Sequence, residues 1–185
     1  MSRDLSEATY VRELPLYVGR PGEGSFNSLR SDLYRDSRSS AYRPYILLVE
    51  DDSADVVLTK SAIQEFVSSA TVEVLRDGQE AILFCDRAES DPSVRCPDLI
   101  VLDLNLPKAE GRNVLAYLRS SRRFQTVPVI VASSSNSTKD RGALLSLGAN
   151  AYFHKPSDYD AFLMLGEVIR ALLPRGSAST GELPG

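Results

Sequence analysis

The sequence is poor in the residues that soft metal ions and disulfides require. Its 185 residues include one histidine, His154, and two cysteines, Cys85 and Cys96. A zinc site needs clustered His and Cys ligands, which this chain cannot supply, so zinc is excluded. Cys85 falls in a helix-like run and Cys96 precedes a proline. We interpret both as thiols rather than as a disulfide, and we therefore expect a reducing, cytoplasmic compartment.

Long apolar runs and an excess of basic residues are also missing. No apolar run approaches the roughly 20 residues of a membrane helix, and the N-terminal MSRDLSEATY lacks the apolar segment of a signal peptide. The formal net charge is −4, which offers no basic surface for a nucleic-acid backbone. We expect neither a membrane nor a nucleic acid as a direct partner.

The two ends of the chain differ in composition from its middle. Residues 1–43 are rich in Ser, Arg, Gly and acids and show no sustained hydrophobic period. Such a segment buries too little apolar surface to offset the entropy lost on ordering. We expect residues 1–43 to be a disordered or loosely attached extension, residues 44–173 to form one folded domain, and residues 174–185 to be a disordered tail.

Within the middle region, strand-like and helix-like segments alternate five times. The strand-like runs are 45–49, 71–75, 99–102, 129–132 and 151–154. The helix-like segments are about 53–66, 78–87, 111–120, 139–147 and 159–173. Several strand-like runs are almost entirely apolar, which is typical of parallel strands covered on both faces. The alternation predicts a doubly wound α/β domain with five parallel strands and five helices.

Polar residues follow four of these strands. They are Glu50 and Asp51 after the first, Asp103 after the third, Ser133 after the fourth and Lys155 after the fifth. In open parallel sheets, ligands bind at the carboxyl ends of the strands. Two carboxylates about 4 Å apart repel by roughly 4 kcal/mol at an effective dielectric constant near 20, so clustered acids call for a cation. Oxygen ligands favour Mg²⁺, beside which an aspartate can act as a nucleophile toward a phosphoryl group.

Longer motifs around these residues resemble the receiver domain of two-component response regulators. The motifs are LLVEDD, PDLIVLDLNLP with Gly111 soon after, VIVASS and YFHKP, and the resemblance covers about residues 44–173. The segment LDLNLPKAEGRNVL is similar to single-domain regulators paired with phytochrome-type histidine kinases. The resemblance implies a flavodoxin-like sheet with strand order 2-1-3-4-5, and a signalling protein rather than a free-standing enzyme.

The resemblance also implies a role for each site residue. Asp103 would accept a phosphoryl group from a phosphohistidine of a partner histidine kinase. Asp51, the Asp103 side chain and the Asn105 backbone carbonyl would bind Mg²⁺ directly, with Mn²⁺ as a substitute. Glu50 would act through a bound water. His154 is expected to be a strand residue, so the phosphoryl group would come from another molecule.

The remaining family positions describe the switch. Lys155 would pair with Asp103, and the Lys155–Pro156 peptide bond is expected to be cis. Ser133 would close onto a phosphoryl oxygen, and Tyr152 matches the aromatic residue that moves inward with it. The acidic pair Glu50 and Asp51 is Glu-Asp rather than Asp-Asp, a variation common enough in the family to leave the chemistry intact. Ser133 stands where Thr is more frequent. Because Ser133 lacks the stiffening β-branch, we expect a looser switch that remains functional.

The third acid after the first strand has a different expected role. Asp52 stands where a helix N-cap belongs, and Asp55 three residues later would complete a pair like a capping box. We therefore assign Asp52 to the start of a helix rather than to the metal.

The output of the domain is expected to be a protein contact, because only a tail follows Leu173. Met164, Val168 and Ala171 widen the apolar stripe of the last helix. This widening fits either a deeply packed helix or a dimer surface, and the phytochrome-type resemblance favours a homodimer.

Three functions are compatible with these residues. The first is a phosphorylatable signalling module. The second is a degenerate receiver that acts as a binding scaffold, against which the intact set of acids, lysine and hydroxyl argues. The third is a hydrolase with an aspartyl-phosphate intermediate. The acceptor segment DLN has no second aspartate two positions after Asp103, which argues against the hydrolase.

Overall fold

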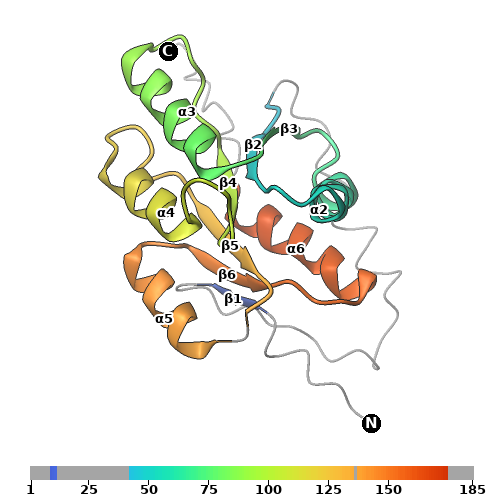
Figure 1. Cartoon of the computed structure of the whole chain (residues 1–185). Coiled ribbons are helices and arrows are strands. Elements are labelled where there is room, and N and C mark those ends of the chain that lie inside the picture. The colour runs from blue at the N-terminus through green and yellow to red at the C-terminus, as the bar shows by residue number, and fades with distance from the viewer. Residues whose placement is uncertain (1–8, 12–41, 136, 175–185) are drawn as a thin grey trace, which may run out of the picture.

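The computed structural model of the chain describes residues 9–11, 42–135 and 137–174. Strands and helices alternate along residues 45–172, as Figure 1 shows. The strands are β1 (Thr9–Val11), β2 (Tyr45–Val49), β3 (Thr71–Leu75), β4 (Leu99–Asp103), β5 (Val129–Ser133) and β6 (Ala151–His154). The helices are α2 (Ser53–Phe66), α3 (Gly78–Ser90), α4 (Gly111–Ser120), α5 (Thr138–Leu147) and α6 (Tyr159–Leu172).

The sheet has the order β1-β6-β5-β4-β2-β3, and its five strands from β2 to β6 are parallel. Counted from β2, this is the predicted order 2-1-3-4-5, so the predicted fold class is confirmed. Strand β3 lies on one side of β2, and the next strand along the chain, β4, lies on its other side. The strand order therefore reverses at β2. Such a reversal leaves a crevice at the carboxyl ends of the strands, where ligands of this fold class bind.

Strand β1 is an addition that the sequence pattern did not predict. Thr9–Val11 pairs antiparallel with β6, so that Tyr10 lies opposite Tyr152. The extension that we expect to be disordered or loosely attached, residues 1–43, thus contributes one short strand to the sheet. Thr, Tyr and Val favour extended backbone, and β6 offers its outer edge for pairing. The other residues of this extension up to 41, and the tail from 175 on, lie outside the described residues.

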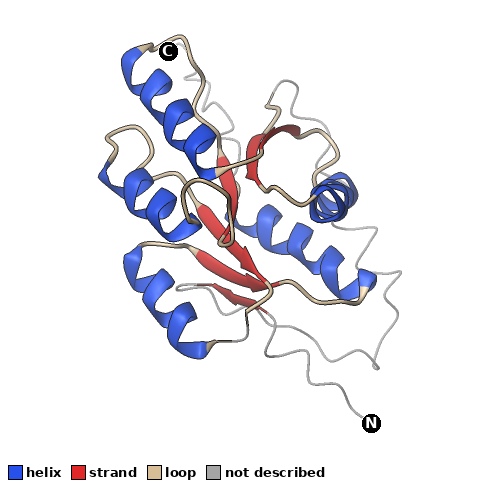
Figure 2. Ribbon diagram, viewed as in Figure 1, coloured by secondary structure: helices blue, strands red, loops and turns tan. Residues whose placement is uncertain are grey.

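Two hydrophobic layers enclose the sheet. Helices α3, α4 and α5 cover one face, while α2 and α6 cover the other (Figure 2). Alternate residues of each strand point to opposite layers, as Leu47 and Val49 do on one side and Ile46 and Leu48 on the other. Because both faces are covered, β2, β4 and β5 are buried at every position. This explains their nearly continuous apolar sequences.

Helix α6 packs closely against α2. A Cβ on Gly166 would lie 2.4 Å from the carbonyl oxygen of Ala62, so only glycine allows this approach. Val168, one of the three residues that widen the apolar stripe, is 3% exposed and belongs to the core. Met164 and Ala171 are exposed. Core packing therefore accounts for part of the stripe, and two of its residues stay on the surface.

Helices α2 and α3 each begin within a few residues of the carboxyl end of a strand. Asp52 caps α2 by accepting hydrogen bonds from the backbone N–H groups of Ala54 and Asp55. Asp77 caps α3 through the N–H of Glu80. The predicted N-cap role of Asp52 is thus confirmed. In the part of the chain that the structure describes, no helix is long and apolar enough to cross a membrane.

Candidate functional site

Three carboxylates meet at the carboxyl ends of β2 and β4. Glu50 and Asp51 directly follow β2, while Asp103 is the last residue of β4. One carboxylate oxygen from each lies within 4.8 Å of the others. Glu50 and Asp103 are buried, at 3% and 5% exposure, whereas Asp51 is exposed. Burial is the main cause that raises the pKa of Glu50, as expected for a carboxylate withdrawn from water.

The cluster suits a hard divalent cation. Its three oxygen donors come without a neighbouring His or Cys ligand in the group. Oxygen-only ligands and one exposed side are the conditions under which Mg²⁺ or Mn²⁺ binds while retaining waters. The residues present therefore fit the predicted cation, and the exposed Asp51 marks the side from which it would enter.

Lys155 provides the positive charge of the site from the end of β6. Its Nζ lies 2.6 Å from Asp103 Oδ1, 2.7 Å from Glu50 Oε2 and 2.8 Å from Asp55 Oδ2. The Lys155 side chain is only 7% exposed. Burial alone would lower the pKa of Lys155, but the three carboxylate contacts outweigh it and raise the pKa above its ordinary value. Lys155 is therefore a permanent cation at neutral pH.

Asp55 is a site residue to which the sequence pattern gave a different role. The predicted pairing with Asp52, in the manner of a capping box, is wrong for its side chain, which contacts Lys155 instead. The Asp52 N–H is bound by Glu50 Oε1 at 3.2 Å. Its position could have indicated a place in the site, because Asp55 lies in the first helical turn after the carboxyl end of β2.

The loop after β4 holds Asp103 through its backbone. The N–H of Asn105 donates to Asp103 Oδ2 at 2.6 Å, and Asn105 itself is exposed. Lys108 has a positive φ of 64° and its Nζ lies 2.6 Å from Asp77 Oδ2. This ion pair ties the loop to the start of α3. The backbone near Asn105, where a carbonyl ligand is expected, is therefore anchored at both ends.

The hydroxyl and the aromatic residue expected for the switch lie on β5 and β6. Ser133, the last residue of β5, is fully buried, and its Oγ accepts a hydrogen bond from the Ser135 N–H at 3.1 Å. The Tyr152 hydroxyl donates to the Ser135 carbonyl at 2.5 Å, and its ring is buried. His154 ends β6 with Nε2 3.3 Å from the Ser134 carbonyl. One loop after β5 thus connects all three residues.

Two details differ from the sequence expectations. The described residues contain no cis peptide bond, so the predicted cis Lys155–Pro156 bond is wrong, and the bond is trans. A trans bond is the intrinsic preference before proline unless tertiary contacts lock the cis form. In addition, Asp103 and Ser133 are the last residues of their strands rather than the residues after them.

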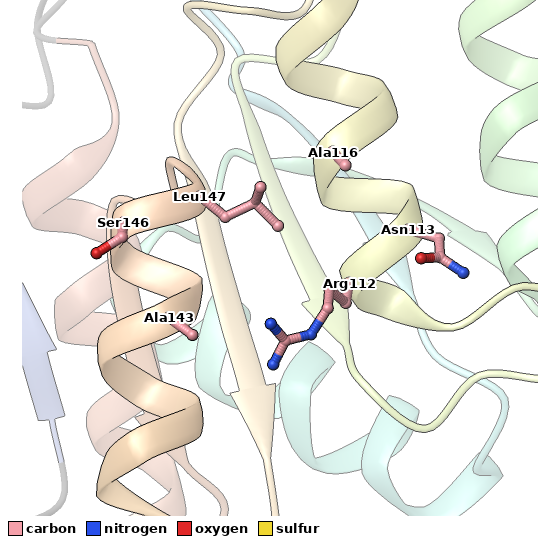
Figure 3. Close-up of a pocket in the computed structure, with 6 residues that line it drawn as sticks. All are labelled: Arg112, Asn113, Ala116, Ala143, Ser146 and Leu147. Carbon is pink, nitrogen blue, oxygen red and sulfur yellow. The ribbon is translucent and has the colours of Figure 1, made fainter.

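A separate groove between α4 and α5 does not belong to this site. Figure 3 shows the Arg112 side chain directed from α4 toward α5. The Arg112 guanidinium lies 3.8 Å from the Asp140 carboxylate of α5, and both side chains are about half exposed. The groove is lined by Arg112, Asn113, Ala116, Ala143, Ser146 and Leu147. None of these lining residues belongs to the acidic cluster.

Comparison with known proteins identifies the class. Residues 46–165 match the family model of the response regulator receiver domain, which is more than half of the chain. The chain belongs to the response regulator receiver family. The resemblance stated from the motifs is thereby confirmed, and receivers of this family are signalling proteins.

Particular relatives narrow the similarity further. Response regulator Rcp1 from Synechocystis sp. is 37% identical over 125 residues, which are 65% of this chain and 82% of Rcp1. The crystal structure of the phosphorylated cyanobacterial phytochrome response regulator RcpA is 33% identical with a TM-score of 0.64, covering 78% of this chain and 100% of RcpA. The Mn²⁺-bound form of Rcp1 is 32% identical with a TM-score of 0.59, covering 77% and 99%. The chain is therefore similar to phytochrome-associated regulators.

Proposed function

We propose that this receiver accepts a phosphoryl group from a histidine kinase onto Asp103 and signals by a change in its protein contacts. The observation that carries the proposal is the position of Asp103. Its buried carboxylate shares the Lys155 ammonium with Glu50 and lies beside the exposed carboxylate of Asp51. A nucleophilic carboxylate next to a cation site and a fixed ammonium is what phosphoryl transfer to an aspartate requires.

A bound Mg²⁺ would neutralise charge on the transferred phosphoryl oxygens. Asp51, Asp103 and the Asn105 carbonyl would hold the ion directly, with Glu50 acting through a water. The chain's own groups then do the rest. The Asn105 N–H and the Lys155 ammonium each bind one Asp103 oxygen. These two bonds orient the carboxylate before a donor arrives.

The transfer itself is a displacement at phosphorus. A carboxylate oxygen of Asp103 forms the new P–O bond while the P–N bond of the phosphohistidine breaks, and the electron pair stays on the imidazole nitrogen. Lys155 then faces a phosphoryl oxygen as well as carboxylates. Ser133 lies at the same edge of the sheet, and its hydroxyl would donate to another phosphoryl oxygen. The receiver would in this way catalyse its own phosphorylation without being a free-standing enzyme.

Phosphorylation of Asp103 would alter the surface of the receiver through the loop after β5. If the Ser133 side chain rotates and carries Oγ toward the phosphoryl group, its present bond from the Ser135 N–H is lost. Because Tyr152 is bonded to the Ser135 carbonyl, movement of this loop also moves the Tyr152 contact.

The partners we propose are a histidine kinase of the phytochrome type, in line with the Rcp1 and RcpA similarity, and a second copy of this chain. Met164 and Ala171 are the exposed α6 residues offered for the homodimer.

Two further proposals concern organisation. We propose residues 44–173 as the receiver, supported by the family match over 46–165 and by described elements from Tyr45 to Leu172. The free thiols of Cys85 and Cys96 support a cytoplasmic location.

The experiment is labelling by phosphoramidate or acetyl phosphate with Mg²⁺, read by intact mass. The wild type should gain one phosphoryl group and Asp103→Asn none. Asp160→Asn, which changes an exposed aspartate of α6, is the matched control and should label like the wild type. A wild type that stays unlabelled with Mg²⁺ present would favour a binding scaffold. Rapid multiple turnover of phosphate esters would favour a hydrolase.

A further inference from the structure

Asp55 touches the reactive centre without being one of its expected metal ligands. Its carboxylate lies 2.8 Å from Lys155 Nζ. It is outside the group of three carboxylates that can share a cation. Helix capping does not need it either, because the Asp52 side chain already caps α2. The contact with Lys155 is therefore the feature of Asp55 that calls for a function.

All N–H donors of the Lys155 ammonium already have an acceptor. The ammonium carries three N–H donors, and three carboxylate oxygens lie 2.6–2.8 Å from its nitrogen. With the phosphoryl group on Oδ2 of Asp103, Oδ1 keeps its contact with Lys155, and a phosphoryl oxygen would be a fourth acceptor for the same ammonium. One existing contact must then weaken or break.

Burial decides which contact breaks at least cost. The Glu50 and Asp103 side chains are 3% and 6% exposed, whereas the Asp55 side chain is 27% exposed. A carboxylate that loses its cation has to be hydrated, which costs most for a buried group. Water can reach Asp55, so its release is cheap. A bound divalent cation would in addition compensate Glu50 and Asp103, but Asp55 is not in that group.

We propose that Asp55 is a positioning residue that holds Lys155 in the unphosphorylated receiver and yields it to the incoming phosphoryl oxygen. The proposal rests on the proposed function of the site. The Asp55 carboxylate and the phosphoryl oxygen would then compete for Lys155. The affinity for a phosphoryl group would be lower by the strength of the Asp55–Lys155 contact. Removing the Asp55 carboxylate should make a phosphoryl group bind more tightly, although a charged site residue has been lost.

The test uses beryllofluoride, which mimics a phosphoryl group on aspartate, with the full chain at saturating Mg²⁺. Binding is followed by the ¹⁹F NMR signal of the bound ion. Asp55→Ala should bind beryllofluoride about three- to fivefold more tightly than the wild type, the strength of a partly exposed ion pair. Asp55→Glu keeps the charge on a longer arm and should stay within about twofold of the wild type.

Asp52→Asn is the matched control. It removes a negative charge three residues away on the same helix start, but Asp52 bonds backbone N–H groups and not Lys155. Its beryllofluoride affinity should change by less than about twofold at physiological salt. An unchanged or weaker affinity in folded Asp55→Ala would overturn the proposal, since a merely structural Asp55 gives that result. A wild type that does not bind beryllofluoride would instead refute the proposed function.

Discussion

The first residue of α4, Gly111, lies directly against the backbone carbonyl of Asp103. A Cβ at position 111 would be 2.1 Å from that carbonyl oxygen and 2.8 Å from Leu104 Cα. Both neighbours are backbone atoms of the segment that carries the proposed phosphoacceptor. A side chain here would therefore have to move the site itself.

Gly111→Ala should lower the free energy of unfolding by about 2 kcal/mol or more, because the backbone has to shift. It should also slow the labelling of Asp103 by phosphoramidate. Urea denaturation and intact mass measure the two effects. Gly142→Ala is the control, since its Cβ would meet nothing within 4 Å, and it should stabilise α5 by about 0.5–1 kcal/mol. Equal stability of the two variants would contradict the predicted close contact.

Asp51 and Asp52 are neighbours in sequence with separate predicted roles. Asp51→Ala should abolish Mg²⁺ binding, because it removes the exposed carboxylate of the acidic cluster. Titration of Mg²⁺ against an NMR or fluorescence signal of the folded variant measures this. Stability should change little, since Asp51 is exposed. Mg²⁺ binding by folded Asp51→Ala at wild-type affinity would refute the assignment.

Asp52→Ala should keep Mg²⁺ binding and lower the free energy of unfolding by about 1 kcal/mol, as loss of an N-cap does. The backbone donors of Asp55 and Ala54 lower the pKa of Asp52. A carboxyl whose folded pKa is lowered stabilises above its unfolded pKa near 3.9, and this stability is lost as pH falls through the folded pKa. The difference between the wild type and Asp52→Ala should therefore shrink below about pH 4 in urea denaturation. A difference that is constant with pH would argue against the cap.

Local sequence was sufficient for the parallel sheet and its helices. Buried runs such as Tyr45–Val49 are apolar at every position, and polar residues follow them. These two signals are short-range, which is why the strands and the cluster of Glu50, Asp103 and Lys155 could be expected from the order of residues alone. The exact strand ends could not, because Asp103 and Ser133 are polar residues that a hydrophobic pattern excludes.

Contacts between distant residues set the limit of prediction from sequence. The pair Asp55 and Lys155 is 100 residues apart, and a local capping rule offered Asp55 a different role. Strand β1 has three residues, too few for a period, and its pairing depends on the free edge of β6. The sequence left open whether Val168 is a core or a surface residue, because the packing of α6 against α2 is known only from the fold.

The two cysteines should differ sharply in reactivity. Cys85 is 1% exposed, and burial raises the pKa of its thiol to about 12, while Cys96 is partly exposed. Because thiolate is the reactive form, Ellman's reagent at pH 8 should modify Cys96 in the native protein and Cys85 only after unfolding. The unfolded thiol has a pKa near 8.5, so the stability from Cys85 is fully present below that pH and is lost as pH rises toward 12. In its native state, Cys85→Ala keeps Cys96 and should react rapidly, whereas Cys96→Ala keeps only the buried Cys85 and should not. Rapid native reaction of both variants would contradict this difference.

Removal of the Lys155 ammonium tests the charge balance of the site. Lys155→Met keeps the length of the side chain but leaves Glu50 and Asp103 buried without their cation. Metal-free protein should lose about 3 kcal/mol of unfolding free energy, the cost of breaking a buried ion pair. Mg²⁺ should restore more stability to this variant than it adds to the wild type, since the ion supplies positive charge to the same cluster of carboxylates. Urea denaturation with EDTA and with Mg²⁺ measures both effects. Arg112→Met breaks the half-exposed ion pair with Asp140 in the groove between α4 and α5, away from the acidic cluster, so it should cost far less stability and respond to Mg²⁺ as the wild type does. If the two variants lose the same stability, Lys155 does not balance the buried carboxylates.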